Sequence, residues 1–195
     1  MKGTIIVGGL SGTTSRVAAC KLSSLSCTAL RSPKMSNLAG VAMDKAGNCY
    51  ADASDTSGKV GLWYYARCAK AGVELGSAQG FNEPNYGGLS VDNEGNIVVI
   101  STGFPSAVTV YSGCAKARCS VISGPFVLNG ESIFGHLGRD NQRWVTVNID
   151  GGTVDVYAYV GHGTGLTYLY SFDVPGCTPS GFCESAAYSP GSPKV

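Results

Sequence analysis

The sequence has few charged residues and no long hydrophobic run. Lys, Arg, Asp and Glu together make up 14% of the 195 residues, against about a quarter in an ordinary soluble protein. The formal net charge of +1 gives no overall field that would attract nucleic acid or an anionic membrane. No apolar run approaches the roughly 18 residues that a membrane helix requires. We therefore expect neither nucleic-acid binding nor a membrane span.

The N-terminus also lacks the core of a signal peptide. Gly8 and Gly9 interrupt the apolar residues Ile5, Ile6 and Val7 too early for such a segment. Either a signal was removed from this chain or none was present.

Zinc-type cysteine spacing is missing as well. The chain has eight cysteines and only two histidines, and no cysteine pair has the C-x2-C spacing of a zinc knuckle. Six cysteines instead form close pairs, which predict local disulfides across turns, and two more are left as a fourth pair. These pairs are Cys20 with Cys27, Cys114 with Cys119, Cys177 with Cys183, and Cys49 with Cys68.

Disulfides imply an oxidising compartment, so we expect a secreted or periplasmic protein. The alternative is a reduced protein whose cysteines are small buried residues.

The sequence does contain an internal repeat. The segment 40–48, GVAMDKAGN, returns at 88–96 as GLSVDNEGN, and a weaker copy follows at 133–141. Asp44, Asp92 and Asp140 are therefore separated by 48 and 48 residues. A period of this length indicates a repeat architecture.

Each copy is followed by short apolar or alternating runs separated by Gly, Ser and Asp turns, and no segment has helical periodicity. Four strands per unit is the pattern of a propeller blade. We therefore predict an all-β fold, a β-propeller built from four blades of about 48 residues, in one domain.

The first unit lacks its opening strand. Residues 185–190 resemble the start of a unit, and pairing them with the N-terminal strands would close the ring and cover exposed edges. The predicted blades are 1–34 plus 184–190, 38–80, 86–127 and 131–173. Four-bladed rings are uncommon, so the alternative is part of a larger ring, shared with a second copy in a homo-oligomer or continued in a longer gene.

The segment Gly40 to Asp52 resembles the blade pattern G-[VL]-[AS]-[VM]-D-x-x-G-N-x-Y-V-A-D of the NHL-repeat and gluconolactonase-like (senescence-marker) propellers. The resemblance covers most of the chain and is specific in units two and three. It implies the fold more than an activity, because such propellers include interaction modules and sugar-lactone hydrolases. The number of blades differs, since those families usually have six.

The connections entering each innermost strand ring the mouth of a propeller channel, so their oxygen-bearing side chains are candidate calcium ligands. These candidates are Asn37, Glu83, Asn85, Asn129, Glu131 and Glu184. The gluconolactonase-like enzymes resemble this arrangement, and there the metal polarises a lactone carbonyl. The alternative is that the Asn residues cap turns and bind nothing.

Glu83 and Glu131 are the preferred catalytic candidates, and His136, in an opening strand, is a candidate general base. Asp52, Asp55 and Asp150 are expected in turns on the same face. The repeated Asp of the Asp-x-x-Gly-Asn turn has a structural explanation, because its side chain bonds the turn backbone. The strand tyrosines are attributed to packing between blades.

These observations lead to three alternative hypotheses for the function. The first is a secreted or extracytoplasmic propeller that binds a small molecule or peptide on its channel face. The second is a calcium-dependent hydrolase of a lactone, such as a sugar lactone or an acyl-homoserine lactone. The third is a structural repeat or an oligomer-forming propeller fragment.

Overall fold

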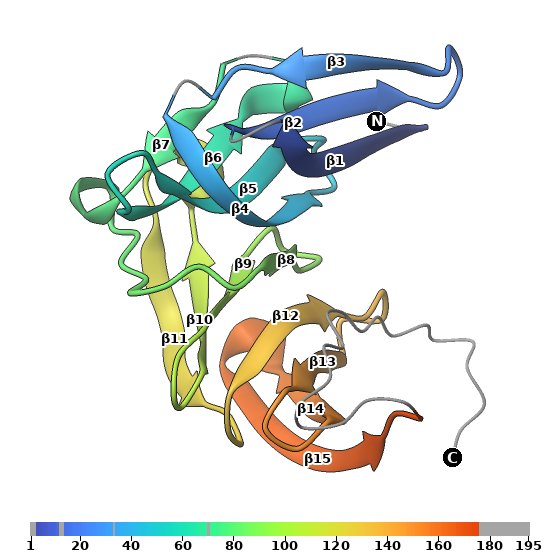
Figure 1. The fold of residues 1–195 in the computed structure, drawn as a ribbon, viewed down its shortest axis with the longest axis vertical. Helices are drawn as coiled ribbons and strands as arrows, with labels where there is room; N and C mark the ends of the chain where they lie inside the picture. The colour runs from blue at the N-terminus through green and yellow to red at the C-terminus, as the bar shows by residue number, and fades with distance from the viewer. Residues whose placement is uncertain (1–2, 12–13, 33, 70, 176–195) are drawn as a thin grey trace.

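The computed structural model describes residues 3–11, 14–32, 34–69 and 71–175, which form antiparallel sheets joined by turns (Figure 1). Their helical segments are four single 3-10 turns of three residues each. Within these ranges, no helix is long and apolar enough to cross a membrane. The predicted all-β class is confirmed.

Four sheets follow one another along the chain. The first has three strands, β1 (Thr4–Ser11), β2 (Thr14–Lys21) and β3 (Ser26–Leu30). Each of the other three has four strands in sequence order. They are β4 (Met35–Met43), β5 (Cys49–Asp55), β6 (Val60–Tyr65) and β7 (Val73–Leu75); β8 (Leu89–Val91), β9 (Ile97–Ser101), β10 (Ala107–Ser112) and β11 (Ser120–Val127); and β12 (Ser132–Leu137), β13 (Arg143–Asn148), β14 (Thr153–Val160) and β15 (Gly165–Asp173).

The sheets are arranged as the blades of an arc, with the N-terminal sheet at one end and β12–β15 at the other (Figure 1). Contacts between sheets run through their first strands, since β1 and β2 pack on β4, β4 on β8, and β8 on β12. Between the described parts of the first and fourth sheets no comparable contact occurs. The C-terminal strand expected to close the first blade, 184–190, lies outside the described residues.

The hydrophobic core lies between the sheets, as blade packing requires. Val17, Met35, Ala51 and Trp63 belong to one cluster between the first and second sheets. A second cluster joins the second and third sheets, and a third joins the third and fourth sheets around Trp144. Successive side chains of a strand point to opposite faces of its sheet, so the two faces of one sheet pack against two different neighbouring sheets.

The repeated glycine of the 48-residue motif lies where two innermost strands meet. A Cβ on Gly40 would lie 2.9 Å from the Cα of Gly88, its repeat counterpart. The atoms that this Cβ would meet belong to the backbone of the neighbouring strand. No side-chain movement could therefore make room for a methyl group. The motif therefore keeps glycine here to let neighbouring blades approach closely.

The Asp-x-x-Gly-Asn element is a turn of the expected kind. The Asp92 carboxylate accepts hydrogen bonds from the backbone N–H groups of Glu94 (2.9 Å) and Asn96 (2.8 Å). Gly95 has a φ of 85°, which favours glycine. The Asn96 amide donates to the same carboxylate over 2.8 Å, so this asparagine is required for its side chain and not for a left-handed backbone.

Three disulfides confirm the predicted pairing within the described residues. Cys20 is bonded to Cys27, Cys49 to Cys68, and Cys114 to Cys119. The fourth pair, Cys177 with Cys183, lies outside the described residues. Three disulfides indicate an extracytoplasmic protein, because thiols stay reduced in the cytosol.

Candidate functional site

A hollow with several polar groups lies on the third blade. It has a volume of about 600 Å³ and is formed by the 82–85 connection, the β9–β10 loop and the outer strands β10 and β11. Glu83 is the one charged side chain in its lining, which contains no Lys, Arg or His. Both loops lie at the end of the blade where the chain enters the innermost strand, which is the face predicted to carry function.

Glu83 is held in a buried, hydrogen-bonded position. Its side chain is only 8% exposed. The Tyr111 hydroxyl donates to Glu83 Oε1 over 2.8 Å, and the Thr109 hydroxyl also bonds the carboxyl group. Burial raises the pKa of Glu83, while these two hydrogen bonds act in the opposite direction. The outcome is a desolvated carboxyl group at the wall of a hollow.

Tyr111 belongs to a second repeat that the sequence reasoning missed. Tyr65, Tyr111 and Tyr157 are spaced by 46 residues, and each holds the connection that leads into its blade. The hydroxyl of Tyr65 bonds Ser32, that of Tyr111 accepts from Asn82 N–H at 3.3 Å, and that of Tyr157 accepts from Asn129 N–H at 3.3 Å. Their spacing of 46 residues signals a repeated role for these tyrosines, whereas packing between blades is the only role predicted for them from the sequence.

Glu83 adds a contact that the repeated tyrosine arrangement does not have in the described residues of the other blades. Its repeat counterpart 48 residues later is Glu131, which is only half-buried. The backbone N–H of Glu131 donates to Asp150 Oδ2 over 2.7 Å. In the third blade alone, among the described residues, the anchoring tyrosine also bonds a carboxyl group.

A second buried carboxyl group, Asp52, lies behind the site. It was expected in a solvated turn, but it belongs to β5 and is fully buried. Its Oδ2 accepts from the N–H groups of Gly87 (3.1 Å) and Gly88 (3.0 Å), and its Oδ1 has no hydrogen-bond partner. Burial raises the pKa of Asp52 to about 7; the two hydrogen bonds oppose this shift, and the charge of Glu83 adds to it.

The remaining wall of the hollow is fixed by polar contacts between its two loops. The Asn85 amide donates to the Thr102 carbonyl over 2.7 Å, and the Thr102 hydroxyl donates to the Tyr86 carbonyl over 3.0 Å. Phe104, at the tip of the β9–β10 loop, is 81% exposed. An aromatic ring at the rim of a mainly apolar hollow with a few fixed polar groups is a typical ligand contact.

The other predicted site residues lie elsewhere. Asn37 is exposed on β4 and donates to Ser54 Oγ over 3.4 Å. Asn129 and Glu131 lie together beside the β13–β14 turn, and His136 is exposed on β12. Glu184 lies outside the described residues. The structure therefore brings Glu83 and Asn85 into one hollow and places Asn129 and Glu131 at the entry of another blade.

The calcium site implied by the resemblance stays a prediction. No three Asp, Glu, His or Cys side chains converge anywhere in the described part of the chain. Glu83 has its carboxyl group bonded to two hydroxyls, and Asn85 uses its amide to join two loops. Calcium needs six to eight oxygen ligands, so we derive no metal-dependent step from these residues.

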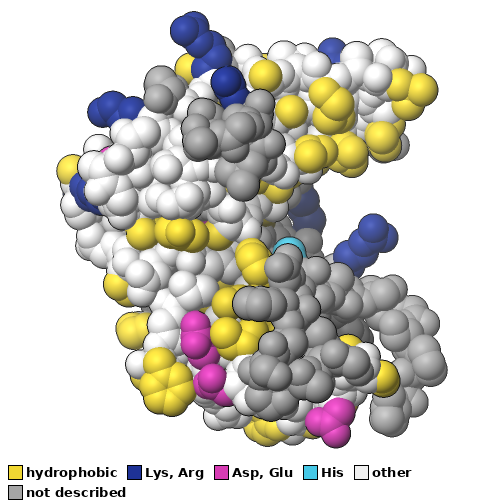
Figure 2. All heavy atoms as spheres, in the orientation of Figure 1, with side chains coloured by type: hydrophobic (Ala, Val, Ile, Leu, Met, Phe, Trp, Pro, Cys, Tyr) yellow, Lys and Arg dark blue, Asp and Glu magenta, His cyan; other side chains and the backbone are white. Residues whose placement is uncertain are grey.

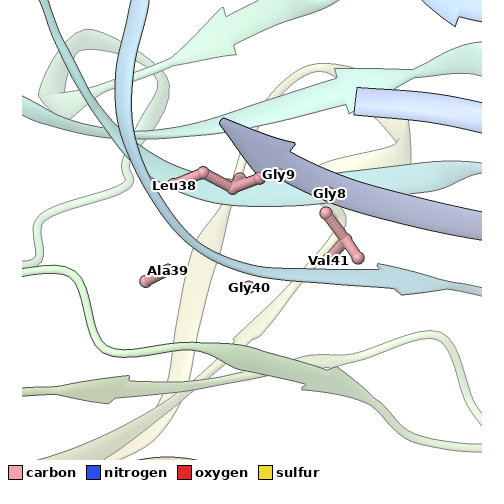
Figure 3. A pocket seen from close by; sticks show the side chains of 6 residues that line it. All are labelled: Gly8, Gly9, Leu38, Ala39, Gly40 and Val41. Atoms are coloured by element: carbon pink, nitrogen blue, oxygen red, sulfur yellow. The ribbon is translucent and has the colours of Figure 1, made fainter. Parts of the chain in front are cut away.

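Two further hollows lie outside this site. One, of about 200 Å³, lies between β1 and β4, where Leu38 and Val41 reach toward Gly8 and Gly9 (Figure 3). No polar side chain lines it. The other, of about 450 Å³, lies between the Asp-x-x-Gly-Asn turns at the opposite end of the blades and contains both Lys45 and Glu94.

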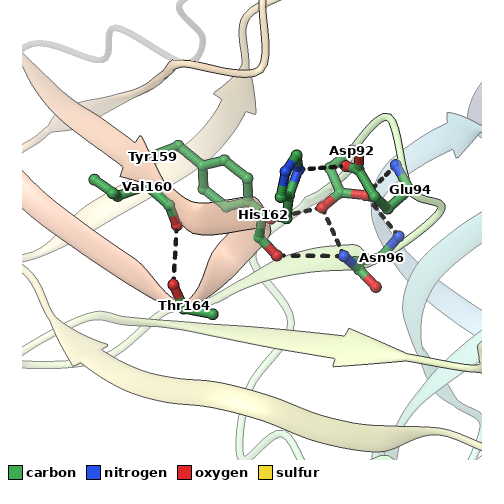
Figure 4. Close-up of polar contacts among 7 residues, drawn as sticks. All are labelled: Asp92, Glu94, Asn96, Tyr159, Val160, His162 and Thr164. Atoms are coloured by element: carbon green, nitrogen blue, oxygen red, sulfur yellow. Dashed lines mark hydrogen bonds and ion pairs between the residues drawn. The ribbon is translucent and has the colours of Figure 1, made fainter.

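Close to that end, polar contacts join the third and fourth blades. The Tyr159 hydroxyl donates to Asp92 Oδ2 over 2.9 Å, and His162 Nδ1 lies 2.9 Å from Glu94 Oε2 (Figure 4). Asn96 also donates to the His162 carbonyl over 3.4 Å. Because Asp92 is also bonded to its own turn, these contacts tie that turn to the fourth blade.

Comparison with known proteins supports the fold alone. No protein-family model matches the chain, and no curated protein matches it. Solved structures do match, and propellers are among them. The fold is that of a β-propeller.

Three of these structures show the extent of the likeness. A protein from Lactobacillus plantarum has a TM-score of 0.57 at 13% identity and covers 89% of this chain and 54% of its own. TolB from Acinetobacter baumannii has a TM-score of 0.59 at 15% identity, covering 86% and 40%. A gluconolactonase from Xanthomonas campestris has a TM-score of 0.54 at 11% identity, covering 76% and 52%. The chain thus spans about half the length of these proteins.

Proposed function

We propose that the protein is a secreted propeller that binds a small molecule or peptide in the hollow beside Glu83. The observation that carries this proposal is the buried Glu83–Tyr111 pair, which keeps a desolvated carboxyl group at the wall of a hollow of about 600 Å³. Concave sites with a few convergent polar groups are where proteins bind small ligands. Two loops joined by Asn85 and Thr102 give this hollow a preformed shape.

The proposal is tested by ligand screening with a blocked variant. Amino acids, short peptides, sugars and lactones are screened by thermal shift against the protein and against Ala107→Phe, which fills the hollow. The control Ala115→Phe fills the hollow at the opposite end of the blades. We expect at least one class to raise the Tm of the wild type and of Ala115→Phe but not of Ala107→Phe. Binding that survives Ala107→Phe, or no binding by any class, contradicts the proposal.

A second candidate function is assembly of two copies through the first blade. Ile5 and Val7 on β1 are each 45% exposed, whereas Ile6 between them packs on the core of the first two blades. Figure 2 shows hydrophobic side chains gathered on this arm of the arc, where it borders the opening. β1 is also an edge strand, whose backbone groups can pair with another strand.

The partner we propose for this face is a second copy of the chain. Inside the arc, the equivalent face of each blade is covered by the next blade. Two copies of this chain would together have about the length of the larger proteins that it matches. Native mass should then report a dimer that Val7→Glu dissociates, whereas the control Val73→Glu, on the outer strand β7, leaves it intact. A monomeric wild type at about 100 μM would overturn this candidate.

A further inference from the structure

We propose that the ligand of the Glu83 hollow carries an organic cation, an ammonium or guanidinium group, which pairs with the Glu83 carboxylate. This inference rests on the proposed function and specifies the chemical class of its ligand. The reasons are the sign of the charges at the hollow, the state of the two carboxyl groups and the aromatic rim.

The charge at the hollow is of one sign. Its lining contains a single charged residue, Glu83, and no Lys, Arg or His. Nowhere in the described ranges does a cationic side chain form an ion pair with Glu83. The hollow therefore offers a negative potential to whatever enters it.

A buried carboxylate without a neighbouring cation is energetically unfavourable. Removing a charge from water is costly unless an opposite charge compensates it, and two hydroxyl donors supply only part of that compensation at Glu83. Asp52 adds to the need, because it is close enough for the Glu83 charge to act on it and one of its oxygens has no partner. A cation bound at Glu83 would relieve both carboxyl groups.

The rim suits the same class of ligand. Phe104 is 81% exposed beside the hollow, and Tyr111 lies within its wall. Aromatic faces attract ammonium and guanidinium groups. The volume of about 600 Å³ accommodates an amino-acid side chain together with part of its backbone, so an Arg- or Lys-bearing peptide fits as well as a free amine.

The test compares a cation with its neutral isostere. N-acetyl-arginine amide and N-acetyl-citrulline amide are titrated by NMR up to about 10 mM, with the backbone amides of Asn85 and Thr102 as reporters. Citrulline has nearly the size and planar shape of arginine without its charge, and a carbonyl oxygen replaces one NH2 group of the guanidinium. We expect the arginine compound to bind at least about tenfold more tightly, equivalent to 1.4 kcal/mol.

Three variants separate charge from folding. Glu83→Gln should remove the preference for the arginine compound, whereas Glu131→Gln, at the repeat-equivalent position, should leave it within about twofold. Phe104→Ala, at an exposed position where folding is not at stake, should weaken binding by about three- to tenfold. Thermal unfolding of each variant shows whether a loss comes from the site or from the fold.

The outcomes also separate this inference from the proposed function. Equal binding of the two compounds, or an arginine preference that survives Glu83→Gln, overturns the cation inference while the hollow stands as a ligand site. No perturbation of Asn85 or Thr102 by either compound, together with a hit for a neutral or anionic class in the ligand screen, also overturns it. No binding by any class overturns both.

Discussion

Asp52 in the second blade accepts a hydrogen bond of 3.0 Å from the backbone N–H of Gly88 in the third blade. A second bond of 3.1 Å comes from Gly87. Because the carboxyl group is fully buried, this contact connects two blades through a group that titrates near neutral pH. It gives the molecule a specific dependence on pH.

The first prediction concerns that dependence. The pKa of Asp52 is raised from 3.8 to about 7 on folding, so between these values the folded state binds more protons than the unfolded state. The free energy of unfolding should therefore fall as pH rises through this window, by up to about 4 kcal/mol from this group. Glu83, whose pKa is also raised, contributes with the same sign.

Asp52→Asn should remove most of this decline, because an amide oxygen can still accept from Gly87 and Gly88 but does not ionise. Urea unfolding at about pH 5 and about pH 8 measures the difference. The control is Asp55→Asn, because hydrogen bonds from Ser57 and Lys59 N–H lower the pKa of Asp55. Its effect therefore lies below this pH range, and the decline should persist in this variant. Parallel profiles for the wild type and Asp52→Asn would contradict the prediction.

The second prediction concerns the anchoring tyrosines. Tyr157→Phe removes only the acceptor for Asn129 N–H, so a loss of about 1 kcal/mol is expected. Tyr111→Phe removes the acceptor for Asn82 N–H and the donor to Glu83, so the loss should be about 2–3 kcal/mol. A double-mutant cycle with Glu83→Gln should give a coupling of about 1–2 kcal/mol. A coupling near zero would show that the hydroxyl and the carboxyl group act independently.

The third prediction concerns the close approach of the innermost strands. Gly40→Ala should destabilise the fold by about 1–3 kcal/mol, because the new methyl group would meet the Gly88 backbone at 2.9 Å. Gly9→Ala on β1 is the matched control, since nothing lies within 4 Å of its Cβ position. Chemical unfolding of both variants provides the comparison, and equal stabilities would refute the explanation of the motif glycine.

The fourth prediction ranks two disulfides. Cys49 and Cys68 are buried and close a separation of 19 residues, whereas Cys20 and Cys27 close one of 7 residues at partly exposed positions. Replacing the first pair with alanine should cost about 3 kcal/mol or more, and replacing the second should cost less. The free energies of unfolding of the two double variants test the order.

The fifth prediction concerns calcium. No three Asp, Glu, His or Cys side chains converge in the described part of the chain. We therefore expect that neither added calcium nor a chelator shifts the Tm by more than about 1 °C. A clear rise with calcium would instead support a site that includes residues such as Glu184, and would favour the lactone hydrolase.

The fold could be predicted because its signals are local and periodic. The repeat of Asp44 and Asp92 indicated the blade length, and the short apolar or alternating runs after each copy indicated four strands per blade. The close cysteine pairs predicted the disulfides for the same reason, since their partners are neighbours in sequence.

The site was less predictable, because it depends on burial and on contacts between blades. Glu83 and Glu131 are 48 residues apart and look alike in the sequence, whereas burial and the bond from Tyr111 distinguish Glu83 in the structure. Asp52 looked like a turn residue, whereas the N–H groups that hold it come from residues 35 and 36 positions later. No property of a single segment reveals such a long-range contact.

The tyrosine spaced every 46 residues also bears on how such a protein can change. Its hydroxyl fixes the entry to each blade, whatever residue follows on that connection. Evolution or a designer could therefore exchange the residue at position 83, or turn its counterpart Glu131 inward, and alter the recognised ligand without rebuilding the blade. In this repeat, binding specificity and architectural support are assigned to different side chains of the same loop.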